Sequence, residues 1–251
     1  MSGHSRWATI RRKKGAADAR RGQLFSKLVR AIIVAAREGG PDPGANLALQ
    51  NAIEKAREAS MPKETIERAI ARGAGAGADG EAYEHVVYEG YGPGGVAVLV
   101  EALTDNRNRT ASDVRHVFTK NDGNLGTSGA VAWQFERKGV ILVDAERFDE
   151  DELMLAAADG GADDVALDGH TFHVTAAPED LAAVRAALAA AGISDESAEL
   201  TMVPKTTVKI EDEADARKLL RLMDDLEDND DVQGVYANFD IPEEVLEAAA
   251  S

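Results

Sequence analysis

A glycine- and alanine-rich segment at residues 73–80 divides the chain into two parts whose apolar residues follow different periods. Before this segment, apolar residues recur every three or four positions, which is typical of amphipathic helices. After it, short runs rich in β-branched residues alternate with helical stretches, which indicates strands and helices together. The segment itself has the composition of a flexible linker. The pattern therefore predicts an α+β protein whose N-terminal part is helical.

Three helices are expected before the linker. The first, at residues 20–37, has one apolar and one cationic face, and Gly39-Gly40-Pro41 ends it. The second lies within residues 45–59, with Leu49 and Ile53 on its apolar side. The third begins at Pro62, a residue suited to the first helical position. We expect these helices to form a domain over residues 1–75.

Two strands, at residues 84–91 and 96–104, are expected after the linker. The turn between them contains the spacing G-x-G-x-x-G at Gly90, Gly92 and Gly95. A dinucleotide-binding site needs a helix after this motif, because the helix N-terminus must meet the pyrophosphate. A strand follows here, so the motif is interpreted as a hairpin turn.

The segment TDNRNRT at residues 104–110 is expected to be a loop. Its two arginines, Arg107 and Arg109, form either a second patch that faces phosphate or RNA, or a polar turn with surface charge. Thr110 and Asp113 have the spacing of a capping box, which predicts that a helix begins there. Residues 131–135 are expected to form a further strand, with Trp133 in the core.

Residues 139–203 have the element order β-α-β-β-α-β, which is typical of a ferredoxin-like arrangement. The last part, a helix at 212–227 between short strands, is too small to fold alone and is expected to complete the first sheet. The predicted fold is a three-helix domain followed by two α/β (ferredoxin-like) domains, the third inserted in the second. The predicted boundaries are 80–136 plus 205–240 for the discontinuous domain and 138–204 for the inserted one.

Charge is distributed unevenly along the chain. Residues 1–40 contain ten Lys or Arg and two acids, a net charge of +8, whereas the whole chain carries −17 and the remainder therefore −25. A basic end on an acidic body points to a polyanionic partner. The alternative is a solvated basic face in which Trp7 serves only for packing. The residues expected to contact nucleic acid are Arg6, Trp7, Arg11, Arg12, Lys13, Lys14, Arg20, Arg21, Lys27, Arg30, Arg107 and Arg109.

Patterns of catalysis and metal binding are not found in the sequence. The chain has no Cys, which excludes thiolate chemistry. His170 and His173 are expected on opposite faces of one strand. The acidic run at residues 224–231 lacks the glycine and distal glutamate of a calcium loop and is interpreted as a solvated helix end. We expect no enzyme activity, cofactor, metal or small-molecule substrate, and no membrane span, since the apolar runs are short.

Several separated motifs resemble the YebC/PmpR family. They are MSGHSRW at residues 1–7, Lys13-Lys14, DARRG at 18–22, GYGPGG at 90–95 and TDNRNRT at 104–110. The resemblance extends over nearly the whole chain. It implies an N-terminal helical domain and two α/β domains, the third inserted in the second. It also implies a cytoplasmic DNA-binding transcriptional regulator, or, as in the mitochondrial members, a translational activator on the ribosome.

Three classes of function stay open at this point. The first is a DNA-binding regulator, which the basic helix favours. The second is a ribosome-associated translation factor that relieves stalling and binds RNA, which suits a basic arm without a base-reading motif. The third is an interaction scaffold whose basic arm binds acidic proteins.

Overall fold

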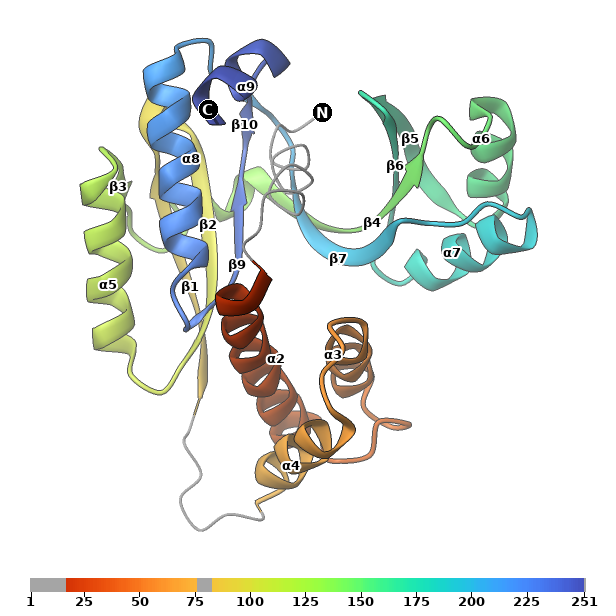
Figure 1. Ribbon diagram of the computed structural model, residues 1–251, viewed down its shortest axis with the longest axis horizontal. Helices are drawn as coiled ribbons and strands as arrows, with labels where there is room; N and C mark the ends of the chain where they lie inside the picture. Colours follow the sequence, from red (N-terminus) through yellow and green to blue (C-terminus); the bar gives the residue numbers. More distant parts are fainter. Residues whose placement is uncertain (1–16, 76–82, 251) are drawn as a thin grey trace.

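The computed structural model describes residues 17–75 and 83–250, and these form an α+β protein as predicted (Figure 1). The helices before the linker are α2 (Ala17–Gly39), α3 (Leu47–Glu58) and α4 (Lys63–Gly73). Leu49 and Ile53 are buried between them, as predicted. The Asn46 side chain joins two of the helices, because it accepts from Leu49 N (3.1 Å) at the start of α3 and donates to Ala35 O (2.7 Å) in α2.

The first sheet follows the linker. Its strands, in spatial order, are β3 (Asn124–Leu125), β1 (Glu84–Tyr91), β2 (Ala97–Thr104) and β9 (Val232–Ala237). β1 and β2 pair antiparallel, with Tyr91 opposite Ala97, across the short 3-10 helix η1 (Pro93–Gly95). The hairpin interpretation of the glycine motif is therefore confirmed.

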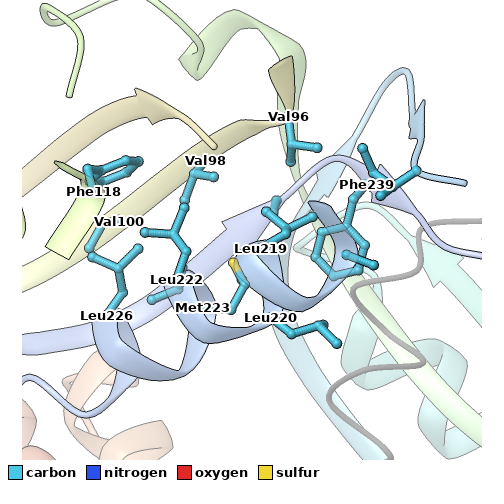
Figure 2. Close-up of a cluster of buried hydrophobic side chains, with 14 of the residues drawn as sticks. Val96, Val98, Val100, Phe118, Leu219, Leu220, Leu222, Met223, Leu226 and Phe239 are labelled. Carbon is cyan, nitrogen blue, oxygen red and sulfur yellow. The ribbon is translucent and has the colours of Figure 1, made fainter. Parts of the chain in front are cut away.

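Two helices, α5 (Arg107–Lys120) and α8 (Glu213–Glu227), contribute to the main hydrophobic core on one face of this sheet (Figures 1 and 2). Close approach explains two glycines of the motif, Gly90 and Gly92. A Cβ at Gly90 would lie 2.6 Å from Phe118 of α5, and one at Gly92 would lie 3.0 Å from Leu219 of α8. Gly90 and Gly92 thus allow α5 and α8 to pack closely on the hairpin.

The second sheet contains the predicted order β-α-β-β-α-β. The elements are β4 (Phe135–Asp144), α6 (Glu150–Asp159), β5 (Ala162–Asp168), β6 (Thr171–Ala176), α7 (Leu181–Ala190) and β7 (Ser197–Pro204). The strands are antiparallel in the order β5-β6-β4-β7, and side chains of both helices are buried against them. Only this sheet, in the part of the chain that the structure describes, has the ferredoxin-like order, since the first begins with a hairpin.

β9 returns to the first sheet after the second one is complete, and it pairs with β2. An inserted domain requires this pairing. The predicted domain boundaries themselves stay a proposal.

The remaining short elements are β8 (Val208–Lys209) and β10 (Phe239–Asp240), which pair parallel, and α9 (Glu243–Ala250), which packs on α8. The sequence pattern did not predict α9. None of the helices in the described ranges is long and apolar enough to cross a membrane.

Two local predictions were wrong. The helix after the second strand begins at Arg107 with Asn106 as its N-cap, whose side chain accepts from Arg109 N (3.1 Å), so Thr110 lies inside the helix. Residues 132–134 form the 3-10 helix η2 (Ala132–Gln134) rather than a strand. Val131 and Phe135 are buried there, and Trp133 between them is 67% exposed.

Candidate nucleic-acid interface

The cationic face of α2 meets the C-terminal end of α8. Gln23 Nε2 donates to Asp228 O at 3.3 Å, and Lys27 Nζ donates to Glu227 O. Carbonyl oxygens at a helix C-terminus carry partial negative charge and lack partners within the helix. Since α8 has no basic residue in its own last turn, α2 supplies the cation from about two hundred residues away.

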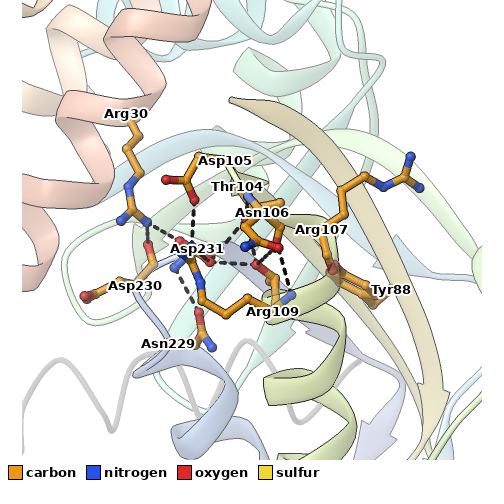
Figure 3. Close-up of polar contacts among 11 residues, drawn as sticks. Arg30, Tyr88, Thr104, Asp105, Asn106, Arg107, Arg109, Asn229, Asp230 and Asp231 are labelled. Atoms are coloured by element: carbon orange, nitrogen blue, oxygen red, sulfur yellow. Dashed lines mark hydrogen bonds and ion pairs between the residues drawn. The ribbon is translucent and has the colours of Figure 1, made fainter. Parts of the chain in front are cut away.

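Asp231 is the centre of the contact between the N-terminal helices and the body. Arg30 Nη1 of α2 lies 2.8 Å from Asp231 Oδ1, and Arg109 Nη2 of α5 lies 2.8 Å from Oδ2 (Figure 3). The hydroxyls of Thr110 (2.7 Å) and Thr104 (3.3 Å) also donate to Oδ2. Each carboxylate oxygen therefore has an arginine partner, and the partners come from two separate segments of the chain, α2 and residues 104–110.

The Asp231 side chain is only 6% exposed. Burial would raise the pKa of this carboxyl, but hydrogen bonds from Arg109 and Thr110 and the charges of Arg109 and Arg30 lower it below its ordinary value. A carboxyl whose pKa is lower in the folded than in the unfolded state stabilises the fold at neutral pH. That stabilisation is lost as the pH falls through the folded-state pKa.

The interpretation of residues 224–231 as a solvated helix end was wrong for Asp231. Asp228 and Asp230 are exposed, whereas Asp231 is buried at the start of β9. One signal in the sequence could have indicated this: Asp231 directly precedes the run Val232–Ala237, which forms β9. The pattern could not indicate the partners, because Arg30 and Arg109 are far away along the chain.

Arg109 and Arg107 have different environments although both begin α5. Cations in the first turn oppose the helix dipole. Asp105 and Asp231 offset this for Arg109, and their hydrogen bonds raise its pKa. Arg107 points away from Asp231 (Figure 3) and lies 3.8 Å from Glu84, with both side chains largely exposed. Arg107 is the more exposed of the two, since its side chain is 67% exposed and that of Arg109 is 47% exposed.

The structure thus brings together Lys27, Arg30 and Arg109, which all contact residues 227–231, and leaves Arg107 apart from them. Arg20 and Arg21 lie in the first turns of α2. The other predicted contacts, Arg6, Trp7, Arg11, Arg12, Lys13 and Lys14, lie outside the described residues. Nucleic-acid contact by any of these residues stays a prediction.

Comparisons with known proteins agree over the whole chain. A family model described as the TACO1/YebC protein N-terminal domain matches residues 5–76, and one described as the TACO1/YebC second and third domain matches residues 83–239. A protein of Rubrobacter xylanophilus named "Probable transcriptional regulatory protein" is 62% identical over 250 residues, covering 100% of both chains. A protein of Syntrophobacter fumaroxidans with the same name is 56% identical, also over 100% of both chains.

A solved structure is similar as well. The crystal structure of a conserved hypothetical protein from Aquifex aeolicus has a TM-score of 0.81 and 54% sequence identity. The match covers 91% of this chain and 94% of that one.

Proposed function

The chain belongs to the TACO1/YebC family, and from this premise we propose that it is a transcriptional regulatory protein that binds nucleic acid through residues 1–40. The observation that carries the proposal is the charge separation, +8 on these residues against −25 on the rest. A polyanion is attracted to the first part and repelled by the second. The names of the relatives support the regulatory role.

The contacts of α2 divide the basic residues into two groups. Lys27 and Arg30 are hydrogen-bonded to the acidic segment 227–231, and they attach the N-terminal helices to the body. The cations that precede them in the sequence are the ones to which we assign phosphate contact. They are Arg6, Arg11, Arg12, Lys13, Lys14, Arg20 and Arg21.

A salt titration tests this assignment. A variant with Arg11, Arg12, Lys13 and Lys14 changed to Ala should bind duplex DNA more weakly, and the slope of log affinity against log salt should fall by about 0.9 for each phosphate that the variant no longer neutralises. Fluorescence anisotropy of a labelled duplex measures both quantities. The matched control removes four exposed cations elsewhere, Lys63, Arg68, Arg147 and Arg217. Equal slopes for the two variants would contradict the assignment.

Ribosomal RNA is the second candidate target, and the placement of α2 favours it. This helix directs Lys27 and Arg30 at the protein body, which is a poor arrangement for reading base edges in a major groove. A basic arm that reads phosphates and shape suits folded RNA. If the protein sediments with ribosomes at low salt, and the four-Ala variant does not, translation rather than transcription is the regulated process.

A further inference from the structure

We propose that Trp133 and Tyr91 form a platform on which the unpaired bases of a single-stranded nucleic acid stack. This inference rests on the proposed function and specifies the form of the ligand. Trp133 is 67% exposed, at the outer side of η2, and Tyr91 at the end of β1 is 37% exposed. Exposure of a large aromatic surface is unfavourable in water, so an aromatic side chain held in this position is well suited to binding.

Both aromatic side chains are held by the same atom. Trp133 Nε1 and Tyr91 Oη each donate to Ala130 O at 3.1 Å. A carbonyl oxygen has two lone pairs and can accept both bonds. The polar edges of the two rings are thus occupied, and what Trp133 offers to a ligand is its apolar surface. Such a surface can stack on any base and distinguishes poorly among base edges, as in sequence-tolerant single-strand binding.

A buried carboxylate fixes the loop that carries Trp133. Glu89 of β1 is 5% exposed and accepts from Gly129 N (2.6 Å), Val131 N (2.7 Å) and Ala132 N (2.7 Å). Burial would raise its pKa, but these three backbone donors lower it below its ordinary value. The loop is also anchored by Val131 and Phe135, which pack under it on the first sheet. A ligand therefore meets a surface that is already ordered, which lowers the entropy cost of binding.

The charge beside the platform fits a phosphate backbone. Segments 124–138 and 201–210 adjoin each other, with Phe135 opposite Pro204 and with Lys205 N donating to Gln134 O (2.8 Å). Together they contain four cations and one acid, Glu136, within a body that is otherwise acidic. Lys138 and Lys209 lie near acids, whereas Arg137 and Lys205 are exposed and have no ion pair among the described residues. A nucleic-acid strand stacked on Trp133 would lie near both cations, because Arg137 is four positions after Trp133 and Lys205 is hydrogen-bonded to Gln134.

Tryptophan fluorescence gives a direct test, because the chain contains only Trp7 and Trp133. In the full chain with Trp7→Phe, emission comes from Trp133 alone. Titration with an unlabelled oligo(dT) or oligo(U) of about fifteen nucleotides should quench it, and a blunt duplex of equal length should quench it much less, because its bases are already stacked. Unchanged emission at saturating single strand would overturn the proposal.

Affinity provides the second measurement. Trp133→Ala should weaken single-strand binding about tenfold, since removal of base–aromatic stacking has effects of that order. Trp133→Phe should have a smaller effect, and Lys205→Ala should lower the salt slope by about 0.7. The control is Leu155→Ala, which removes an equally exposed apolar side chain (68%) on α6.

The outcomes separate this inference from the proposed function. If the four-Ala arm variant no longer binds and Trp133→Ala binds normally, the platform is refuted and the arm assignment stands. If Trp133→Ala and Leu155→Ala weaken binding equally, the effect is not stacking, and the platform is again refuted. If Trp133→Ala changes only self-association, measured by sedimentation, the surface binds protein and the inference is wrong.

Discussion

Asp231 and Glu89 are two buried carboxylates with different kinds of hydrogen-bond donors. The residue Asp231 as a whole is 4% exposed, and its carboxylate is bound by side chains of α2 and of residues 104–110, both more than a hundred positions away along the chain. Glu89 is 5% exposed and is bound by three backbone N–H groups of one loop. Both have a pKa below the ordinary value despite burial.

The difference determines what each carboxylate can do. Side-chain donors can be removed singly by mutation, and the charged ones are weakened by salt where they are exposed. Backbone N–H donors are present whatever the side chains of the loop, except at a proline. We therefore expect mutation or salt to weaken the contact that Asp231 makes between the N-terminal helices and the body, which we call the joint. Glu89 should hold the loop that carries Trp133 in one conformation.

Replacement of Asp231 should have the largest effect. Asp231→Ala leaves two arginines and two hydroxyls without their shared acceptor, and removal of one partner from a buried ionic cluster lowers the free energy of unfolding by about 3 kcal/mol. Urea unfolding measures this value. In hydrogen exchange, the variant should lose more protection in α2 than in β2, relative to the unchanged protein. The reason is that α2 is then no longer attached to the body through this carboxylate.

Asp230→Ala is the matched control for this change. Asp230 is exposed, and its contact with Arg30 uses the backbone oxygen, which the substitution keeps. Its effect should be within about 0.5 kcal/mol of zero. Equal effects of the two substitutions would mean that the joint does not depend on the buried carboxylate.

Glu89→Gln should have an intermediate effect. The amide keeps one acceptor oxygen, but its NH₂ group replaces the other and leaves at least one backbone N–H of the loop without its acceptor, which lowers the free energy of unfolding by about 2 kcal/mol. The change should be confined to the loop, so the emission of Trp133 in the Trp7→Phe background should change while α2 stays protected from exchange. Glu84→Gln, at an exposed residue of the same strand, should alter neither property.

The smallest of the expected losses of stability is that of Arg30→Ala, with Arg107→Ala as its control. Arg30→Ala removes a 2.8 Å ion pair whose carboxylate is buried, together with a contact to the Tyr83 ring (5.6 Å to its centroid), and should destabilise the protein by about 1.5 kcal/mol. Arg107→Ala removes an exposed pair at 3.8 Å and should change stability by less than about 0.5 kcal/mol. Thermal unfolding at low and high salt measures both. A larger effect at Arg107 would reverse the assignment of Arg30 to the joint.

Local pattern was sufficient for the elements and for much of the packing. The apolar positions of α3, the hairpin at the glycine motif and the order β-α-β-β-α-β are all where the sequence predicts them. The reason is that a helix or strand must present its apolar side chains to the core at its own period. The charge asymmetry is likewise a property of the sequence itself.

Tertiary structure alone decided which charged and aromatic side chains are buried. Asp231 can be buried because Arg30 and Arg109 bind its carboxylate, although each is more than a hundred positions away along the chain. No local sequence pattern predicts such a contact. Trp133 is exposed because the chain turns through η2 between two anchors, Val131 and Phe135. A tight turn interrupts the period from which burial is predicted, so composition favoured the core for this residue while the backbone path placed it at the surface.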